Sequence, residues 1–300
     1  MQPVNQEISP KKYKKKYSPK PKWLKQRLPR GGEYEKTRQM LKKSNLCTVC
    51  QEARCPNQFE CFSKGTATFM LMGETCTRNC RFCAVSHAGV TPLDPDEPSR
   101  IAEAVASMEL QYAVLTSVTR DDLADGGADH FVRTITAITE RCPLMRVEVL
   151  IPDFQGNGEA LAHLCAHPPV VINHNVETVS SLYTQVRPQA VYERSLELLA
   201  RVKKYNADII TKSGLMLGLG ESREQLTVTM QDIRDTGCDL LTLGQYLQPG
   251  TKNIEVARYV PPEEFAEIRE QALAMGFKGV AAGPHVRSSY QAEALYLQAV

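Results

Sequence analysis

Apolar and polar positions follow two different periods along the chain from residue 67 onward. Short continuous apolar runs are typical of strands buried on both faces of a sheet, and stretches whose apolar residues recur every three or four positions are typical of helices. The apolar runs predict six strands, over residues 67–73, 112–118, 147–154, 170–176, 208–220 and 239–247. The helical spacing predicts helices near 98–110 and 127–142, around Leu161 and Leu164, over 191–205, through Leu226, Met230 and Ile233, and from Pro261 to Gly276.

The order of these elements predicts an α/β fold. Each connection between strands is long enough for a crossover helix, so we expect a parallel sheet of six βα units, a partial (βα)6 barrel. Six units fall short of the eight that close a full barrel. Functional side chains in such folds gather at the carboxyl ends of the strands, and the loops after each strand are therefore where we expect the chemistry.

The composition is that of an ordinary globular protein. Of its 300 residues, 42% are apolar and 23% are charged, which is close to the usual proportions. No stretch approaches the roughly 18 uninterrupted apolar residues of a membrane-spanning helix, and the beginning of the chain carries no apolar export signal. We therefore expect a cytoplasmic protein, with an organelle matrix as the alternative location.

Basic residues are concentrated at the beginning of the chain. Ten of the 36 basic residues and one of the 34 acidic residues lie within 1–30, which leaves 26 basic and 33 acidic residues for the rest. The simplest interpretation is a solvated, disordered arm; the alternatives are an arm that docks an acidic partner, one that touches nucleic acid, and a transit peptide. We expect four segments: this arm over 1–30, a cysteine-rich extension over 31–66, the barrel over 67–284 and a C-terminal segment over 285–300.

The chain has ten cysteines, and seven of them lie between residues 47 and 83. The other three, Cys142, Cys165 and Cys238, stand alone in apolar segments and are interpreted as small buried side chains. In a chain without an export signal, a cluster of thiols indicates metal or redox chemistry rather than a disulfide framework.

One cysteine group, Cys76, Cys80 and Cys83, has C-x3-C-x2-C spacing and directly follows the first predicted strand. That position is the mouth of the expected barrel. A structural zinc site normally takes four protein ligands, whereas three thiolates on a four-iron, four-sulfur cluster leave one iron open for a cofactor or substrate. Spacing and position together favour a cluster, with a zinc knuckle as the alternative.

The other group, Cys50, Cys55 and Cys61, has C-x4-C-x5-C spacing and precedes the expected barrel. Proline and asparagine residues interrupt this segment, so we expect little room for a helix in it. Together with Cys47 the group offers four thiols, and a structural zinc site is a real alternative to a cluster here.

These motifs carry a resemblance to a known family. The C-x3-C-x2-C loop after the first strand resembles the radical S-adenosylmethionine (SAM) superfamily. C-x4-C-x5-C, GTATFM, C-x3-C-x2-C and a terminal RSSY, in this order, resemble the lipoyl synthase family within it. Further matching stretches, among them TSVTRDDLADGGADHF, EVLIPDFQG, NHNVETV and RYVPPEEF, extend the resemblance over roughly residues 20–295. Cys47 and the stretch TKNIEV at 251–256 depart from the family pattern.

The resemblance implies a partial barrel of the radical SAM type that holds two four-iron, four-sulfur clusters. The cysteines of C-x3-C-x2-C would hold the cluster that binds SAM, with Phe82 packed near the adenine. The cysteines of C-x4-C-x5-C would hold an auxiliary cluster, whose fourth ligand would be Ser289, the second serine of RSSY.

The resemblance also implies a reaction and a set of partners. The reaction is sulfur insertion at carbons six and eight of an octanoyl chain attached to a lysine of a lipoyl carrier domain, with two SAM molecules used per product and the auxiliary cluster as the sulfur source. The implied carriers are the E2 subunits of 2-oxoacid dehydrogenases and the glycine-cleavage H protein. Flavodoxin or ferredoxin would donate the electron, and cluster-assembly proteins would rebuild the auxiliary cluster. Neither a membrane nor a nucleic acid is implied.

Polar and sulfur-bearing residues near the fourth and fifth predicted strands are further candidates for contacts with SAM or substrate. They are Asn173, Asn175, Glu177, Lys212 and Met216. Alternate residues of a strand point the same way, so the first three would face the barrel mouth together, although turn-forming residues also fit the pattern. His174 faces the opposite side and is interpreted as a core histidine. Arg194 and Arg258 fit cofactor contacts and surface ion pairs about equally.

Two other functions stay open at this point. Another radical SAM sulfur-inserting enzyme, of the biotin synthase or methylthiotransferase kind, would share C-x3-C-x2-C but lack both C-x4-C-x5-C and RSSY. A zinc-stabilised binding module that uses the basic arm on nucleic acid would bind zinc and show strongly salt-dependent binding. The βα pattern, with cysteines at the expected barrel mouth, argues against this second alternative.

Overall fold

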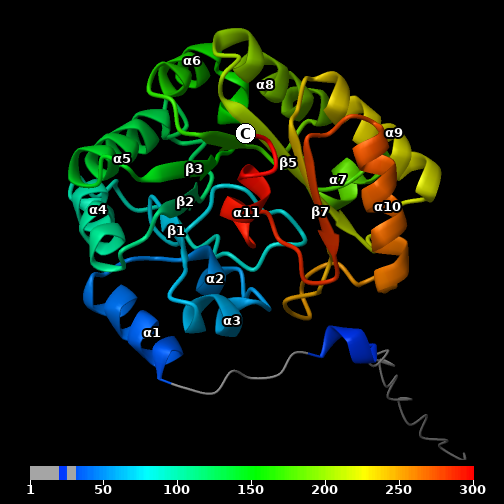
Figure 1. The fold of residues 1–300 in the computed structure, drawn as a ribbon, viewed down its shortest axis with the longest axis horizontal. Coiled ribbons are helices and arrows are strands. Elements are labelled where there is room, and N and C mark those ends of the chain that lie inside the picture. Colours follow the sequence, from blue (N-terminus) through cyan, green and yellow to red (C-terminus); the bar gives the residue numbers. More distant parts are fainter. Residues whose placement is uncertain (1–19, 26–31) are drawn as a thin grey trace, which may run out of the picture.

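The computed structural model describes residues 20–25 and 32–300 (Figure 1). Apart from residues 20–25, the basic arm predicted over 1–30 lies outside the described residues. Among the helices of the described part, none is long and apolar enough to cross a membrane.

Seven strands form one parallel sheet whose spatial order follows the chain. They are β1 (Thr68–Leu71), β2 (Tyr112–Ser117), β3 (Arg146–Leu150), β4 (Val171–Asn173), β5 (Ile210–Leu217), β6 (Leu240–Gln245) and β7 (Gly279–Gly283). The six predicted strands are confirmed, and the sheet is an open, partial barrel in which β1 pairs with β2 and β7 pairs with β6. The sequence does not predict β7 because its residues, GVAAG, are small and form no bulky apolar run.

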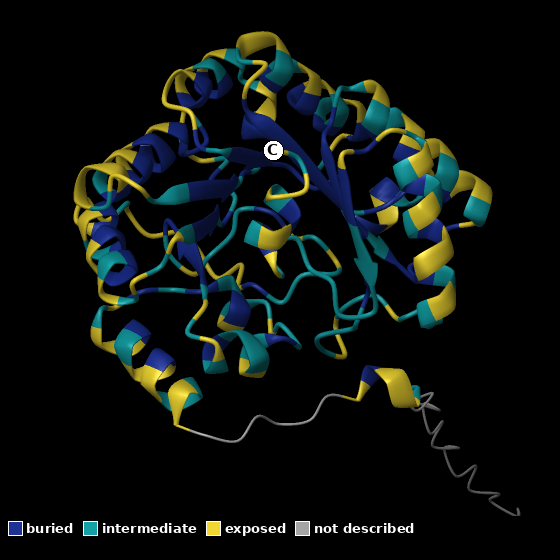
Figure 2. Cartoon of the chain, in the orientation of Figure 1, coloured by how far each residue is buried: buried dark blue, intermediate teal, exposed yellow. Residues whose placement is uncertain are grey.

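Six helices connect the strands and cover the outer side of the sheet (Figure 1). They are α4 (Glu97–Ser107), α5 (Ala128–Arg141), α6 (Gly158–Ala166), α8 (Tyr192–Tyr205), α9 (Arg223–Asp235) and α10 (Pro262–Ala274), and all six are predicted from the sequence. Short turns, η2 (Phe154–Gly156), η3 (Ser180–Leu182) and α7 (Tyr183–Val186), lie between strands and helices. Figure 2 shows the reason for the helical spacing: each helix buries one face against the sheet and exposes the other.

Local polar residues set where two of these helices begin. The Asn157 side chain accepts hydrogen bonds from the first backbone N–H groups of α6, and Ser222 and Gln225 form a reciprocal capping box at the start of α9. Such caps satisfy N–H groups that have no partner within the helix. The loops before α6 and α9, which lie on the carboxyl side of the sheet, are thereby held in place.

The cysteine-rich extension folds as three helices beside β1. These are α1 (Glu33–Lys43), α2 (Val49–Glu52) and α3 (Gln58–Ser63), and the short 3-10 turn η1 (Lys22–Leu24) precedes them. The expectation of little room for a helix between Cys50 and Cys61 is wrong. Helices of four and six residues fit on either side of Pro56, and they carry Cys50 and Cys61. Thr48 pairs with Phe69 of β1 in an antiparallel bridge, which attaches the extension to the sheet.

The C-terminal segment runs from β7 across the extension and back into the barrel. Asn57 Nδ2 donates a hydrogen bond to the His285 carbonyl at 2.6 Å, and Tyr290 Oη bonds Glu60 Oε1 at 3.0 Å. The final helix, α11 (Ala292–Tyr296), lies within the ring of strands (Figure 1), and its Leu295 packs against the first residues of β4, β5 and β6. The segment thus joins the extension to the barrel, on the side where β1 and β7 do not meet.

Candidate functional site

A cavity of about 540 Å3 lies at the carboxyl ends of the strands. Its walls include residues that end or follow β2 to β7, together with residues of the cysteine-rich extension and of the loop after β1. This volume is within the range of small-molecule and cofactor sites. The position agrees with the general rule for βα barrels, in which chemistry takes place at this end of the sheet.

Both cysteine groups reach this cavity, from different parts of the chain. Cys76, Cys80 and Cys83 line it from the loop between β1 and α4, and Cys50 and Cys55 line it from the extension. The tertiary structure therefore brings the two groups to the walls of a single cavity, although β1 separates them along the chain.

The third cysteine of the extension, Cys61, is close enough to Cys55 for their charges to interact, but it does not line the cavity. Among the described residues, no three thiol, imidazole or carboxylate groups are close enough to share a single metal ion. The cysteine ligands of an iron–sulfur cluster bind different irons and need not converge on one point.

Burial raises the pKa of five of the six thiols in the two cysteine groups. The pKa rises to about 12 for Cys50 and Cys83 and to about 11 for Cys61, and it also rises for Cys55 and Cys80. Burial has this effect because a thiolate is poorly solvated away from water. Cysteine binds metals as the thiolate, so loading either group with a cluster would release protons.

Backbone hydrogen bonds hold the loop that carries Cys76, Cys80 and Cys83. The N–H groups of Arg78 and Thr119 donate to Cys76 Sγ, at 3.4 and 3.3 Å. On the far side of the loop, Asn253 Nδ2 donates to the carbonyl of Cys83 at 2.7 Å. The loop after β6, which contains Asn253, therefore supports the loop that carries Cys76, Cys80 and Cys83.

The two serines of RSSY have different surroundings. Ser288 Oγ is hydrogen bonded to the amide of Asn175. The hydroxyl of Ser289 has no hydrogen-bond partner among the described residues, and Ser289 lines the cavity together with Cys50 and Cys55. The serine that the resemblance implies as a cluster ligand is thus the one whose oxygen is available.

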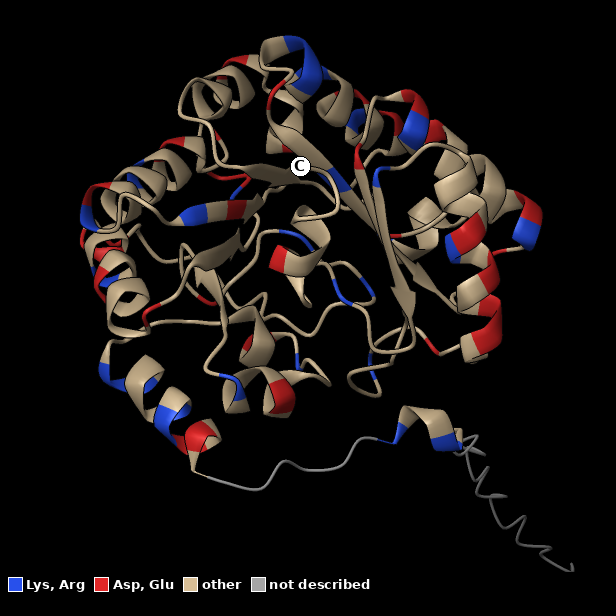
Figure 3. Cartoon of the chain, viewed as in Figure 1, with Lys and Arg blue, Asp and Glu red and all other residues tan. Residues whose placement is uncertain are grey.

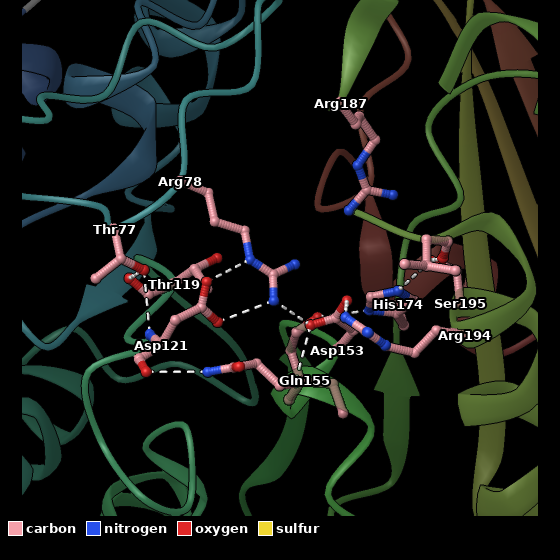
Figure 4. A network of polar contacts seen from close by, with 12 residues as sticks. Thr77, Arg78, Thr119, Asp121, Asp153, Gln155, His174, Arg187, Arg194 and Ser195 are labelled. Atoms are coloured by element: carbon pink, nitrogen blue, oxygen red, sulfur yellow. Dashed lines mark hydrogen bonds and ion pairs between the residues drawn. The ribbon is translucent and has the colours of Figure 1, made fainter. Parts of the chain in front are cut away.

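Arg78, which lies within the CTRNC sequence, is a buried cation that sequence reasoning overlooks. It is 4% exposed and pairs with two carboxylates: its Nε lies 2.7 Å from Asp121 Oδ2, and its Nη2 lies 2.5 Å from Asp153 Oδ1 (Figure 4). Burial alone would raise the pKa of Asp153, but the hydrogen bond and charge of Arg78 lower it to about 2. These two ion pairs join the loop of C-x3-C-x2-C to the loops after β2 and β3.

Two further arginines line the cavity, one beside each cysteine group. The charge of Arg187 acts on Cys80, and the charge of Arg287 acts on Cys55. Glu177 interacts with both guanidinium groups, and burial raises its pKa against their influence. Arg287 is the first residue of RSSY and could have been singled out on that ground, whereas no local pattern distinguishes Arg187.

Four of the six residues predicted to contact SAM line the cavity: Phe82, Asn175, Glu177 and Met216. Glu177 adopts a left-handed backbone conformation, with φ of 71°, which is uncommon for a residue with a side chain. Its N–H donates to the Gly214 carbonyl at 2.8 Å and its carbonyl accepts from the Met216 N–H at 2.8 Å, so these bonds hold the turn after β4 against β5.

The predicted contacts of Lys212 and Asn173 with the cofactor need correction. Lys212 is fully buried and its Nζ lies 2.5 Å from Oε1 of Glu148, which is also fully buried. Asn173 is opposite Lys212 in the sheet and does not line the cavity. Both side chains share the inward direction of Asn175 and Met216, but Asn173 precedes Asn175 by two residues and Lys212 precedes Met216 by four, so both lie deeper in the barrel than the cavity.

The remaining polar candidates have structural partners. His174 is buried and hydrogen bonded, as predicted for a core histidine: its Nδ1 lies 2.9 Å from the Ile151 carbonyl and its Nε2 lies 3.0 Å from Ser195 Oγ. It nevertheless contributes to the cavity lining, so the prediction that it faces away from the barrel mouth is wrong. Arg194 pairs with Asp153 at 3.3 Å, and Arg258 pairs with Glu264 at 2.6 Å. These contacts favour the interpretation of the two arginines as ion-pair residues.

The cysteines outside the two groups lie away from the cavity lining. Cys165 and Cys238 are buried, as predicted, whereas Cys142 is only half-buried because it ends α5 at the surface. Cys47 donates a hydrogen bond from its thiol to Glu74 at 3.4 Å. Burial raises the pKa of the Cys47 thiol to about 12, with a further contribution from this carboxylate.

Two family models match the sequence. The model described as the radical SAM superfamily matches residues 70–233. The model described as the N-terminal domain of lipoyl synthase of the radical SAM family matches residues 3–55.

Curated relatives are similar over nearly their whole length. A lipoyl synthase of Desulfotalea psychrophila is 58% identical over 280 residues, which are 93% of this chain and 94% of the relative. A lipoyl synthase of Chlorobaculum tepidum is 55% identical over 276 residues, 92% of this chain and 95% of the relative.

Solved structures share the fold at much lower identity. A crystal structure of methylornithine synthase is 12% identical with a TM-score of 0.55, over 77% of this chain and 68% of that one. A maturase of the FeFe-hydrogenase is 17% identical with a TM-score of 0.58, over 76% of this chain and 54% of that one. At these identities the similarity concerns the fold alone.

Proposed function

Because this chain belongs to the lipoyl synthase family of the radical SAM superfamily, we propose that its two cysteine groups hold the family's two clusters at the walls of one cavity. Its activity is that of a lipoyl synthase, which inserts sulfur into an octanoyl chain borne by a carrier protein. Its cofactors are SAM and two four-iron, four-sulfur clusters. We propose below which residues hold each cluster and which contact SAM and the octanoyl chain.

The donor sets on the two sides of the cavity fit these clusters. Three thiols in the loop after β1 leave one coordination position open, as a cluster that must also bind SAM requires. The three thiols of the extension leave the auxiliary cluster one protein ligand short of four. The hydroxyl of Ser289 supplies this fourth ligand. The observation that carries the proposal is that Ser289 lines the same cavity as Cys50 and Cys55, with no other partner for its hydroxyl among the described residues.

The chain's own residues position the reacting groups. When bound, the cofactors supply two things: a radical that removes hydrogen from an unactivated carbon, and the sulfur atom that replaces this hydrogen. The backbone N–H groups of Arg78 and Thr119 orient the Cys76 sulfur. Apolar side chains in the cavity wall suit an octanoyl chain and keep water away from it; they include Met70, Val118, Ile151 and Leu215.

Four of the predicted contacts remain candidates for binding SAM. Phe82, between Cys80 and Cys83, offers an aromatic face for the adenine. Asn175 and Glu177 offer hydrogen-bonding groups to the polar part of SAM, and Met216 packs against the same buried cluster as Phe82, which includes Tyr246. Support for these roles comes from their shared position in the cavity wall.

The substrate is an octanoylated carrier protein, as the family membership implies. We propose the E2 subunits of 2-oxoacid dehydrogenases and the glycine-cleavage H protein as the carriers, and flavodoxin or ferredoxin as the electron donor. Since sulfur comes from the auxiliary cluster, repeated turnover would also require cluster-assembly proteins. Location in the cytoplasm stays a prediction.

The test is the content of iron, acid-labile sulfide and zinc per chain after anaerobic reconstitution. We expect about eight irons and eight sulfides for the natural sequence, and about four of each for either Cys55→Ala or Cys76→Ala. Cys142→Ala, which alters a thiol outside both groups, is the matched control and should retain about eight. About four irons together with bound zinc in the natural sequence would assign the extension to a structural zinc site and overturn the proposed auxiliary cluster.

A further inference from the structure

Four exposed basic residues lie on segments that form or support one wall of the cavity, and we name them the basic edge: Lys20, Arg54, Arg81 and Lys252. Lys20 and Arg54 line the cavity themselves, and Arg81 and Lys252 neighbour the lining residues Cys80 and Pro249 along the chain. The four basic residues come from four separate parts of the chain, namely the segment before α1, the extension, the loop of C-x3-C-x2-C and the loop after β6. Figure 3 shows blue segments in the loops beside α2 and α3, whereas the outer helices carry red and blue segments together.

Hydrogen bonds through the loop after β6 keep three of these residues near one another. Arg54 Nη1 donates to the carbonyl of Pro249 at 3.3 Å. Five residues later in the same loop, the Ile254 N–H donates to the carbonyl of Arg81 at 3.0 Å. Lys252 lies between these two attachment points. The basic edge is therefore built on a loop that is fastened at both ends, one to each cysteine-bearing segment.

The cavity reaches the surface at this edge. Lys20 and Arg54 are exposed to solvent and also contribute to the cavity lining, together with Pro249. Any substrate that enters here must pass the basic edge, and any protein that delivers it must lie against these residues.

The basic edge differs in its pairing from other charged groups around the cavity. None of its four side chains forms an ion pair with another described residue. The loop after β2, elsewhere around the cavity, differs: Asp121 and Asp122 each pair with a buried arginine. The contrast is sharper because residues 31–300 carry more acidic than basic residues overall.

We propose that the basic edge docks an acidic face of the carrier domain next to its octanoylated lysine. The proposal rests on the proposed function, since it needs an octanoyl chain that enters the cavity from a folded carrier. Unpaired cations at a mouth attract an acidic partner, speed its association and orient it, and salt screens these effects. The carrier's acidic residues would face Arg54, Arg81 and Lys252 while its lysine points past them into the cavity.

The experiment compares the double variant Arg81→Glu/Lys252→Glu with the control Lys204→Glu, each loaded with both clusters. Neither Arg81 nor Lys252 makes a side-chain hydrogen bond to another described residue, so the fold should tolerate the change. Lys204 is exposed at the end of α8, at the opposite end of the barrel. Two probes are used: an octanoylated lipoyl domain, and a short peptide with one octanoyl-lysine.

We expect the double variant to bind the octanoylated domain about tenfold more weakly or worse at low salt, with the difference shrinking as salt increases. Turnover of the peptide, SAM cleavage and iron content should be unchanged, and Lys204→Glu should behave as the natural sequence. Unchanged affinity of the double variant for the domain, or an equal loss with the peptide or with Lys204→Glu, would overturn the docking proposal. Failure of the proposed function is recognised separately, as a low iron content or absent SAM cleavage in the natural sequence.

Discussion

Asn175, two residues after β4, and Ser288 in the C-terminal segment are hydrogen bonded across 113 positions of the chain, with 2.7 Å between Nδ2 and Oγ. The bond fixes the first serine of RSSY against the sheet. The next residue, Ser289, faces the cavity with its hydroxyl available. Two adjacent and chemically identical side chains are thus assigned to different tasks, one to holding the segment and one to the proposed cluster.

Substitution of each serine by alanine should separate these tasks. Ser288→Ala should lower the free energy of unfolding by about 1 kcal/mol, the usual worth of one hydrogen bond, and leave the iron content near that of the natural sequence. Ser289→Ala should have the same free energy of unfolding as the natural sequence but should lose iron faster when a chelator is added. Anaerobic denaturation and iron analysis measure the two effects. Equal iron loss in both variants would show that Ser289 has no separate role.

Gly244 of β6 faces the backbone of the C-terminal segment, and a larger residue there should displace that segment. A methyl group at Gly244 would collide with the carbonyl oxygen of Val286, while one at Gly283, directly opposite in β7, would meet the Val286 side chain at an ordinary 3.5 Å. Gly244→Ala should therefore cost about 1–3 kcal/mol and move Ser289 out of place.

Iron analysis is the measurement for this pair of variants. Gly244→Ala should reduce the iron content toward about four per chain by weakening the auxiliary cluster, and Gly283→Ala should keep about eight. A full iron content in Gly244→Ala would mean that the segment can shift without loss of the fourth ligand.

The buried pair of Lys212 and Glu148 should matter for stability rather than for SAM binding. Lys212→Met leaves the Glu148 carboxylate buried with Tyr112 as its remaining partner, and breaking such a pair typically costs about 3–5 kcal/mol. The double variant Lys212→Met/Glu148→Leu should be more stable than Lys212→Met alone. Chemical denaturation gives the free energies, with Lys278→Met as control, because Lys278 is half exposed in its pair with Asp239. Normal stability with weakened SAM binding would restore the cofactor role predicted from the sequence.

His174 should make the fold less stable at mildly acidic pH. Burial lowers its pKa to about 4, whereas an unfolded chain titrates near 6.5. Between these values only the unfolded state takes up the proton, so the free energy of unfolding should fall as the pH drops below about 6.5 and level off near 4. From pH 7 to 5 the loss should be on the order of 2 kcal/mol.

The pH profile of His174→Gln provides the check. The free energy of unfolding of this variant should be lower at pH 7 but should fall much less between pH 7 and 5. His163→Gln, a change at an exposed position, is the control and should show the pH profile of the natural sequence. Parallel profiles for His174→Gln and the natural sequence would mean that other groups cause the acid sensitivity.

The strands, helices and cysteine spacings could be predicted because each depends on residues that are near one another in the chain. An apolar run marks β1 or β6 whatever surrounds it, and C-x3-C-x2-C after a strand lies at the barrel mouth because parallel strands share one carboxyl edge. β7 could not be predicted in this way, because the small residues of GVAAG pack in a sheet without forming a run of bulky apolar side chains.

Only the tertiary structure decides how deep a side chain lies in the barrel and which residues distant in the chain come together. The alternation of a strand shows that Lys212 and Met216 point to the same side, but four residues span about 13 Å along a strand, enough to separate a cavity wall from the packed interior. The fold class predicts that the cavity lies at the carboxyl ends, but the depth of the cavity along each strand depends on the register with neighbouring strands. Likewise, the sequence around Arg187 or Ser289 does not show that either residue lies beside a cysteine group. This proximity arises only when the sheet curves and the C-terminal segment folds back across the extension.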